Sequence, residues 1–333
     1  MELSAIALQY TAKEQVRCTE TRLPQPLPHQ VVAKASCSGV STGTEALIFR
    51  GEIESGMQLD SSLSGLSDAT IDYPFTYGYA WVGTVEHTGA EVSGLVRGDR
   101  IFAFAPHQSR HILNAEDCIK IPSSINNRTA TLLPSMETAL SIVHDAAPVA
   151  GEEITVFGQG LIGLLTTWLL SQFPLKHLRA VDPSTERHAL SQSLGVHETL
   201  TPEELTLSTK SDKTIEVSGN PAALQNAIAN TRDHGQVIIA SWYGTRTANL
   251  CLGTHFHRGR IQLVSSQVSN IGPVLRGTWN KTRRLLYAMD RLSALPENLL
   301  AANEIPFRDS PNLYPQALAH TDRLTHTYFT YGE

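Results

Sequence analysis

Short apolar runs alternate with turn signals along the first 120 residues. The runs are rich in Val or alternate apolar with polar positions, which is typical of half-buried strands. Clusters of Pro and Gly at 23–28 and 94–98 separate them and indicate turns. The pattern therefore predicts a β-rich part, with strands over Ala5–Gln9, Gln30–Ala35, Trp81–His87 and Ile101–Ala105.

A polar stretch interrupts this pattern between Gly51 and Asp72. It contains mainly Ser, Gly, Asp and Glu and few large apolar residues. Long connections of this kind are usually functional lids or disordered segments. We interpret this one as a loop that lines or covers a substrate entrance, which would suit a bulky substrate.

From about residue 130 the apolar spacing becomes helical, and strands then alternate with helices. Thr129–His144 and Lys281–Leu292 show the helical period, and short apolar runs between them indicate strand–helix units. This alternation predicts an α/β class with a doubly wound parallel sheet. We divide the chain into a β-rich part (1–125), a parallel α/β domain (126–268) and a return to the first domain (269–333).

Composition and charge narrow the choice of function. The chain has 333 residues, 41% hydrophobic and 17% charged, which indicates a folded protein rather than a disordered or fibrous one. A net charge of −6 with scattered basic residues argues against a nucleic-acid partner. Four separate cysteines without a CxxC pair favour a reducing cytoplasm. We expect neither a membrane span nor a signal peptide.

A glycine motif lies between a predicted strand and a predicted helix. It has the form GxGxxG, which in this setting is the fingerprint of dinucleotide binding. The first glycine permits a tight turn, the second lets the backbone approach a pyrophosphate, and the third lets the helix pack on the strand. The helix N-terminus attracts the phosphates. The motif consists of Gly158, Gln159, Gly160, Leu161, Ile162 and Gly163.

An acidic residue ends the next predicted strand. Asp182 lies 19 positions after Gly163, where a carboxylate accepts hydrogen bonds from a ribose and repels a 2′-phosphate. The alternative is a helix cap or a turn residue. Ser184 and Arg187, beyond Pro183, are able to hold a 2′-phosphate instead. The motif therefore favours NAD and keeps NADP as the alternative.

Five segments together resemble the medium-chain dehydrogenase/reductase superfamily, which has the alcohol dehydrogenase fold. The resemblance covers nearly the whole chain. It implies a GroES-like catalytic domain, a Rossmann domain and a homodimer. The matching segments are Ser38–Glu45, Tyr77–Val85, Gly94–Arg100, Pro148–Glu152 and Glu216–Asn220.

The resemblance also completes the expected cofactor site. The segment after Glu216 lies near the nicotinamide end in this superfamily. Ligands of open α/β sheets bind beyond the carboxyl ends of the strands. The further cofactor candidates are Ser218, Gly219, Asn220, Ser241, Trp242, Ser266 and Gln267.

Two stretches, Ser41–Glu45 and Phe256–Val268, resemble one branch of the superfamily most closely. That branch contains bacteriochlorophyllide a dehydrogenase, which oxidises a hydroxyethyl side chain of a tetrapyrrole. We carry over the branch and not the substrate.

The residues that hold catalytic zinc in the superfamily are replaced. The position of its first cysteine reads Ser41, the histidine reads Tyr79, and the following glutamate reads Ala80. Hydroxyl and phenol groups are poor substitutes for thiolate and imidazole. We therefore expect no zinc. A rearranged site would have to use Cys37, Glu45, His107 or Glu137.

Without zinc, another group has to donate the proton that carbonyl reduction requires, and a hydroxyl within hydrogen-bond reach can act as this general acid. Tyr79 is the first candidate, with a packing aromatic as the alternative. Ser41, Thr42 and Thr44 are able to relay a proton or to cap a helix that starts near Thr44. Glu137 is a candidate to orient a donor or to titrate.

These inferences predict a zinc-independent oxidoreductase that transfers hydride between a nicotinamide cofactor and a small-molecule alcohol or ketone. The first alternative is an enoyl or quinone reductase that acts on C=C bonds with the same cofactor. An alternative of another class is a non-catalytic sensor that binds the nicotinamide and does not turn over, because a fold does not imply an activity.

Overall fold

A computed structural model describes residues 3–54, 56–58, 70–206, 209–296, 299, 301–319 and 325–332. The chain forms two compact units, Met1–Pro134 with Leu292–Glu333 and Ser135–Arg291. Residues 269–291, which the sequence analysis gave to the returning segment, cluster with the second unit. No helix among the described residues is long and apolar enough to span a membrane.

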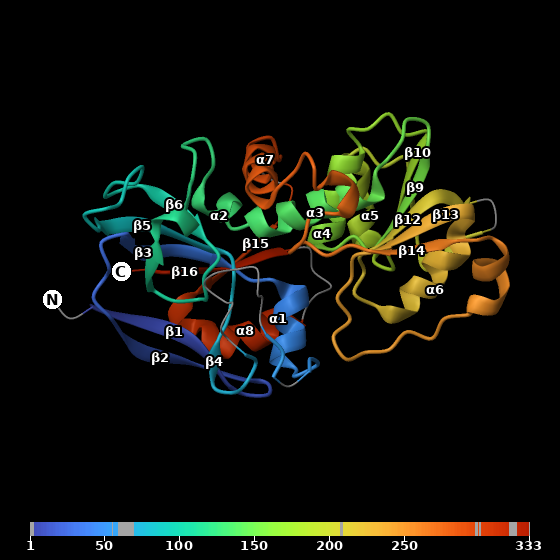
Figure 1. The fold of residues 1–333 in the computed structure, drawn as a ribbon. Coiled ribbons are helices and arrows are strands. Elements are labelled where there is room, and N and C mark those ends of the chain that lie inside the picture. Colours follow the sequence, from blue (N-terminus) through green and yellow to red (C-terminus); the bar gives the residue numbers. More distant parts are fainter. Residues whose placement is uncertain are drawn as a thin grey trace. The chain divides into compact units, whose positions relative to one another are not determined.

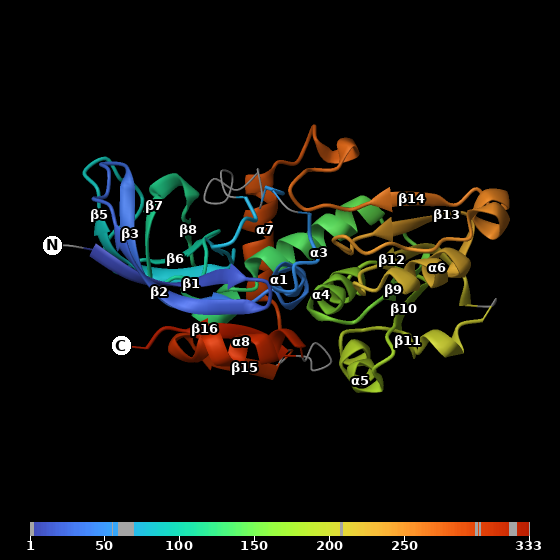
Figure 2. The same ribbon diagram turned by 90° about the horizontal axis from the view of Figure 1, so that it is seen from below.

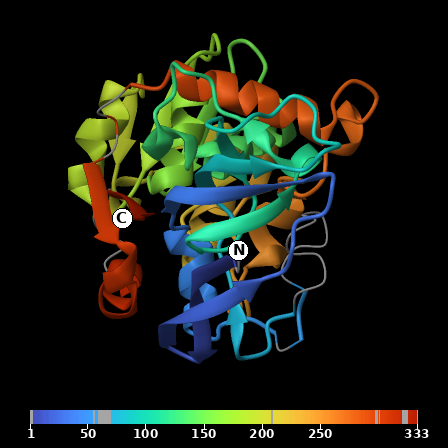
Figure 3. The same cartoon turned by 90° about the vertical axis from the view of Figure 1, so that its left-hand side faces the viewer.

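The first unit contains two mostly antiparallel sheets (Figures 1 and 3). The smaller has the order β2-β1-β4, and the larger has the order β15-β16-β3-β5-β6-β8, with β7 paired to β3. Their bounds are β1 Leu3–Ala12, β2 Gln15–Leu23, β3 Gln30–Gly39, β4 Phe75–Thr76, β5 Trp81–Thr88, β6 Arg100–Ala103, β7 Arg110–Asn114, β8 Ile119–Lys120, β15 Ala301–Pro306 and β16 Thr325–Thr330.

Segments from both ends of the chain form the core of this unit. Strand β16 pairs antiparallel with β3, with Tyr328 opposite Gly39. Among its described residues, the unit contains the helices α1 (Thr42–Phe49), α2 (Asn127–Ala130) and α8 (Ser310–Ala319). Figure 2 shows the red C-terminal helix α8 beside the blue N-terminal strand β2. Side chains of β1, α1, α8 and β16 meet in one apolar cluster that includes Leu8, Tyr10, Ile48, Tyr314 and Phe329.

The second unit is built on a six-stranded parallel sheet of the order β11-β10-β9-β12-β13-β14 (Figure 1). The strands are β9 Glu153–Phe157, β10 His177–Val181, β11 Glu198–Leu200, β12 Ser211–Glu216, β13 Thr231–Ile239 and β14 Gln262–Ser265. The helices are α3 Leu133–Ala146, α4 Leu161–Leu170, α5 Thr185–Ser193, α6 Pro221–Asn230 and α7 Lys281–Ser293. The predicted α/β class is confirmed.

The order of the strands creates a switch point beside β9. The chain leaves β9 toward β10 and β11 on one side, and it returns to β12 on the other side. In open parallel sheets, ligands bind beyond the carboxyl ends of the strands at this reversal.

The predicted helix over 129–144 is two helices. Helix α2 ends at Ala130 and is followed by its C-cap residue, Thr131. The hydroxyl of Thr131 donates to the carbonyl oxygen of Arg128 at 2.7 Å and contacts Nε2 of His326 at 2.7 Å. These side-chain bonds compete with a continuous helix. Of the predicted loop between Gly51 and Asp72, residues 55 and 59–69 lie outside the described residues.

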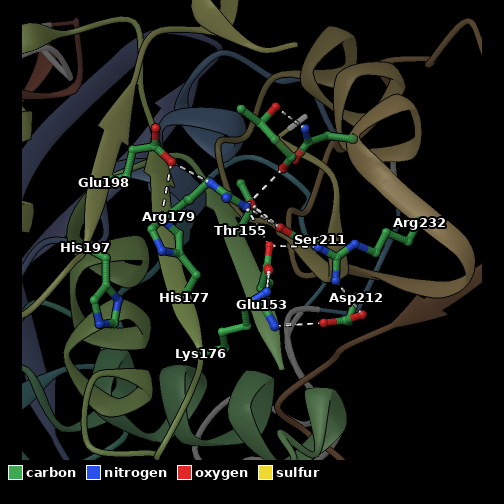
Figure 4. A network of polar contacts seen from close by, with 12 residues as sticks. Glu153, Thr155, Lys176, His177, Arg179, His197, Glu198, Ser211, Asp212 and Arg232 are labelled. Carbon is green, nitrogen blue, oxygen red and sulfur yellow. Dashed lines mark hydrogen bonds and ion pairs between the residues drawn. The ribbon is translucent and has the colours of Figure 1, made fainter. Parts of the chain in front are cut away.

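A network of ion pairs joins the opposite, amino ends of the parallel strands (Figure 4). The buried carboxylate of Glu153 contacts Lys176 Nζ at 2.8 Å, Arg232 Nη2 at 2.9 Å and Arg179 Nη1 at 3.4 Å. Arg179 Nε also donates to Glu198 at 2.6 Å. These ion pairs connect strands β9, β10, β11 and β13 at the amino edge of the sheet. They do not involve the carboxyl edge.

We predict that Glu153→Gln destabilises the protein in a pH-dependent way. The hydrogen bond from Lys176, together with Arg232, lowers the pKa of Glu153 to about 2. A lowered folded-state pKa gives stability that is present above the unfolded pKa of about 4.3 and is lost as the pH falls toward 2. Urea unfolding at pH 7 should show a loss of about 2 kcal/mol. The difference from wild type should shrink at pH 3.

The exposed Glu203 offers a matched control for this experiment. Glu203→Gln should change the free energy of unfolding by less than about 0.5 kcal/mol at either pH. A Glu153→Gln deficit that stayed constant between pH 7 and pH 3 would contradict the assignment.

Candidate functional site

The predicted cofactor residues gather at the carboxyl edge of the parallel sheet. Gly158, Asp182, Ser241 and Ser266 each follow a strand end by one or two residues. Backbone bonds hold these segments together: Gly158 N donates to Val181 O at 2.8 Å, and Ser266 N donates to Ile239 O at 2.9 Å. The structure therefore brings the candidates from β9, β10, β12, β13 and β14 to one edge.

The three glycines of the motif have different physical roles. Gly158 has φ +96°, and a Cβ there would lie 2.5 Å from Ser218 Cα. A Cβ on Gly163 would lie 2.0 Å from the carbonyl oxygen of Gly158, so helix α4 packs directly against the loop. A Cβ on Gly160 would meet nothing within 4 Å. The space above Gly160 is what an approaching pyrophosphate needs.

The side chain of Gln159 connects the glycine loop to helices α4 and α5. It is fully buried, and its Oε1 accepts from Thr167 of α4 at 3.2 Å and from Ser191 of α5 at 3.0 Å. Its Nε2 donates to the carbonyl oxygen of Gly158 at 3.0 Å. Gln159 thus orders the loop, while Gly160 caps α4, which begins with Leu161 and Ile162.

Asp182 is already engaged by the protein. Its Oδ2 accepts from Gln159 N at 2.7 Å and from Arg187 Nη1 at 3.1 Å, and its Oδ1 accepts from Ser184 N at 2.9 Å. The carboxylate therefore joins the glycine loop to the turn at Pro183 that leads into α5. Arg187, which was a candidate for a 2′-phosphate, neutralises this carboxylate.

A buried acid that the sequence analysis did not select ends strand β12. Glu216 Oε1 accepts from Ser218 N at 2.9 Å and from Ser218 Oγ at 2.5 Å, and Tyr243 donates its hydroxyl to Oε2. Burial, followed by the charge of Glu216, raises the pKa of Tyr243. The available signal was the acidic residue at the end of an apolar strand.

Glu216 and its partners organise the remaining candidates of this edge. Gly219 N donates to Ser241 Oγ at 2.8 Å. Asn220 Oδ1 accepts from Ala222 N at 3.1 Å and caps α6. Trp242 is 39% exposed, so its indole is available to a ligand at this edge.

In the first unit, two predicted catalytic segments lie side by side. Gly39 N donates to the carbonyl oxygen of Ala80 at 2.8 Å. This bond joins the end of β3, two residues before Ser41, to the residue that follows Tyr79. The ring of Tyr79 is half-buried and packs edge-on against Tyr77 at 5.9 Å between centroids.

A fully buried acid–imidazole pair lies beneath these segments. Glu45 Oε2 contacts His107 Nε2 at 3.1 Å and accepts from the hydroxyl of Tyr314. His107 Nδ1 contacts Ser38 Oγ at 2.7 Å. Gly78 has φ +124°, and a Cβ there would lie 2.8 Å from the imidazole of His107. The sequence analysis weighed Glu45 and His107 only as ligands of a rearranged metal site.

Helix α1 starts earlier than the expected start near Thr44. Ser41 is the cap residue but makes no side-chain cap bond, and Thr42 and Thr44 lie in the first turn. The cap bond comes instead from Glu45, whose Oε1 accepts from Ser41 N at 2.7 Å. The hydroxyl of Ser41 is therefore not required as a helix cap.

Two other candidates are buried away from solvent. Glu137 forms an ion pair with Arg284 Nη2 at 3.0 Å. Burial raises the pKa of the Cys37 thiol to about 12, which disfavours the thiolate that metals bind. No group of three His, Cys, Asp or Glu side chains suited to a metal ion occurs in the described part of the chain.

Known proteins resemble this chain in part of its sequence. No protein-family model matches the chain. An L-threonine 3-dehydrogenase of Photorhabdus laumondii is 27% identical over 210 residues, 51% of this chain and 60% of that protein. The chain thus spans about 60% of the length of this curated relative.

Solved structures match over nearly the whole chain. The 2R,3R-butanediol dehydrogenase of Bacillus subtilis has a TM-score of 0.79 at 18% identity, over 98% of this chain and 100% of that one. An alcohol dehydrogenase of Escherichia coli complexed with NADH has a TM-score of 0.78 at 14% identity, over 98% and 99%. The chain therefore has the alcohol dehydrogenase fold. The predicted resemblance to the medium-chain dehydrogenase/reductase superfamily is confirmed.

The glycine geometry predicts opposite effects for two alanine substitutions. Gly160→Ala adds a Cβ in open space and should leave the melting temperature within about 2 °C of wild type, while it weakens NADH binding. Gly163→Ala forces α4 away from Gly158 and should lower the melting temperature by about 4 °C or more. Thermal unfolding and NADH fluorescence titration measure both. Equal melting temperatures for the two variants would refute the contact at Gly163.

Proposed function

We propose that the protein is a zinc-independent, nicotinamide-dependent oxidoreductase that interconverts an alcohol and a ketone. The observation that carries this proposal is the geometry at the carboxyl edge of the parallel sheet, where a Cβ on Gly160 would meet no atom within 4 Å and Asp182 directly follows the neighbouring strand β10. A cytoplasmic location, a homodimer, a bulky substrate and the branch of bacteriochlorophyllide a dehydrogenase remain predictions.

The arrangement of the strands supports one direction for the cofactor. Asp182, after β10, would hold the adenosine ribose, and the loop at Gly160 would hold the pyrophosphate. Since β12, β13 and β14 lie on the other side of β9, the nicotinamide half would extend over Ser218, Ser241 and Ser266.

The pairing of Asp182 with Arg187 makes the cofactor preference testable. Asp182→Ala should weaken NADH binding by about tenfold or more, because it removes a charged acceptor for the ribose. Arg187→Ala should weaken NADPH binding by a similar factor and leave NADH binding equal or tighter, because Oδ2 of Asp182 is released. Fluorescence titrations with each nucleotide measure both dissociation constants.

Asp182→Asn is the comparison for the loss of charge, since it keeps the size of the side chain and one acceptor oxygen. It preserves only one of the two backbone contacts, because Gln159 N and Ser184 N bind different oxygens of Asp182. If neither Asp182→Ala nor Arg187→Ala changed the ratio of NADH to NADPH affinity, this assignment would fail.

The donor set supports a mechanism without zinc. Ser41, Tyr79 and Ala80 occupy the positions of the superfamily's zinc-binding segments, and none of them offers thiolate or imidazole. Of the residues left for a rearranged site, Glu45 and His107 bind each other in the core, and Glu137 is paired with Arg284. The proposal therefore assigns the proton transfer to hydroxyl groups.

Tyr79 is the proposed proton donor. Held at Gly160 and Asp182, a dihydronicotinamide cofactor would supply the hydride for carbonyl reduction, and the substrate oxygen would then require one proton. The phenol of Tyr79 would donate that proton to the substrate oxygen. Ser41, Thr42 and Thr44 lie at the start of α1, from which their hydroxyls would relay a proton from solvent water to the phenolate.

Tyr79→Phe tests this role directly. It should lower kcat for ketone reduction by about 10²-fold or more, and it should leave the NADH dissociation constant unchanged. Steady-state kinetics over a ketone panel, with and without a metal chelator, are the measurement. Full activity of Tyr79→Phe, or loss of wild-type activity in the chelator, would rule out the proposed donor.

The same assay separates the two alternatives. Reduction of an enone to the saturated ketone without an allylic alcohol would assign the enoyl or quinone reductase activity, with Tyr79 as the donor to carbon. Saturable NADH binding without turnover of any carbonyl or enone would assign the non-catalytic sensor.

A further inference from the structure

Helix α7 buries one arginine, Arg284, which is 1% exposed. Its Nε and Nη2 donate to the same carboxylate oxygen of Glu137, at 3.1 and 3.0 Å. Glu137 is also buried, on α3. A buried charge pair of this kind is costly to break, because removal of one partner leaves the other charge uncompensated.

The other contacts of Arg284 are with two backbone carbonyl groups and one side chain of α3. Nη1 donates to the carbonyl oxygen of Asn270 at 3.1 Å and to Ser141 Oγ at 3.1 Å. Nη2 also donates to the carbonyl oxygen of Val268. The rigid guanidinium fork therefore connects one carboxylate to two carbonyl groups of the loop that follows β14.

Helix α3 fixes the same loop at a third point. Ser266 Oγ donates to Asp145 Oδ2 at 2.7 Å. Gly272 also lies against this carboxylate, since a Cβ there would be 2.6 Å from Asp145 Oδ1. Glu137, Ser141 and Asp145 are four residues apart, so they form one polar face of α3.

The anchored residues alternate along the loop. Ser266, Val268 and Asn270 are tied to α3 and α7, whereas Gln267 is exposed and bonds only locally, with Nε2 to Ser269 Oγ at 2.9 Å and Oε1 to Ser269 N at 2.8 Å. The loop is thus held through alternate residues, Ser266, Val268 and Asn270, while Gln267 between them is exposed.

We propose that Arg284, held by Glu137, is a positioning residue for the nicotinamide half of the cofactor. The inference rests on the proposed function, in which the dinucleotide extends from Gly160 past β12 and β13 toward β14. The loop after β14 is the last segment on that path, and its backbone groups would set the orientation of the nicotinamide. Glu137 thereby has a role other than titration.

The experiment compares two ligands. ADP-ribose contains the adenosine and pyrophosphate parts and would need only Asp182 and the glycine loop, whereas NADH also carries the nicotinamide. In Arg284→Lys and Glu137→Gln, the affinity for NADH should fall by about tenfold, while the affinity for ADP-ribose stays within about twofold. Isothermal titration calorimetry measures both ligands.

Two further variants keep this test decisive. Ser141→Ala removes one acceptor of Arg284 without leaving a charge unpaired, so it replaces Arg284→Lys as the test if that variant does not fold. It should show a selective but smaller loss of NADH affinity. Arg291→Met, on the same helix but 25% exposed beside Asp290, should leave both affinities unchanged. Thermal unfolding confirms that each variant is folded.

The outcomes separate this inference from the proposed function. Failure of the wild type to bind either ligand would refute the nucleotide site itself. Wild-type binding with equal losses for NADH and ADP-ribose, or with no loss in folded variants, would refute the positioning role and leave the site intact. A selective loss of NADH affinity and of kcat supports it.

Discussion

The close contact between Gly163 and the carbonyl oxygen of Gly158 is the constraint on which the second unit depends. It brings the first turn of α4 against the end of β9, so the free N–H groups of the helix face the carboxyl edge of the sheet. Helix N-termini attract phosphate, but only a backbone without side chains permits this approach. Gln159 then ties the loop to α4 and α5, and Asp182 ties it to β10. The proposed nucleotide site is therefore a consequence of how tightly one helix packs on one strand.

Glu153 and Glu216 are buried carboxylates at opposite edges of the parallel sheet, and they have different kinds of hydrogen-bond partner. At the amino edge, Glu153 is surrounded by cationic side chains, and the charges satisfy one another. At the carboxyl edge, Glu216 is satisfied by a backbone N–H group and hydroxyl groups. Dipolar partners leave a carboxylate ordered without crowding it with bulky cations. The amino edge is thus closed by paired side chains, whereas the carboxyl edge has the ion pair of Asp182 with Arg187 beside β10 and backbone and hydroxyl groups beside β12.

The features that the sequence predicted are local in the chain. The glycine motif, the strand ends and the acidic residue after β10 lie within about 25 consecutive positions, where spacing alone determines proximity. The unpredicted contacts are long-range: Tyr314 reaches Glu45 across 269 positions, and Arg284 reaches Glu137 across 147. No periodicity indicates such pairs. The start of α1 was misplaced for a related reason, because its cap is the carboxylate of Glu45 rather than a Ser or Thr hydroxyl.

The buried cluster around Glu45 also bears on the order of assembly during synthesis. The carboxylate, His107 and Tyr10 emerge early from the ribosome, whereas Tyr314, which donates to Glu45 and contacts Tyr10, belongs to a helix near the other end of the chain. Strand β16, which pairs with β3, arrives later still. The second unit has all its strands before then and is able to fold first, since domains generally fold as units during translation. The first unit therefore begins synthesis first and completes its core last.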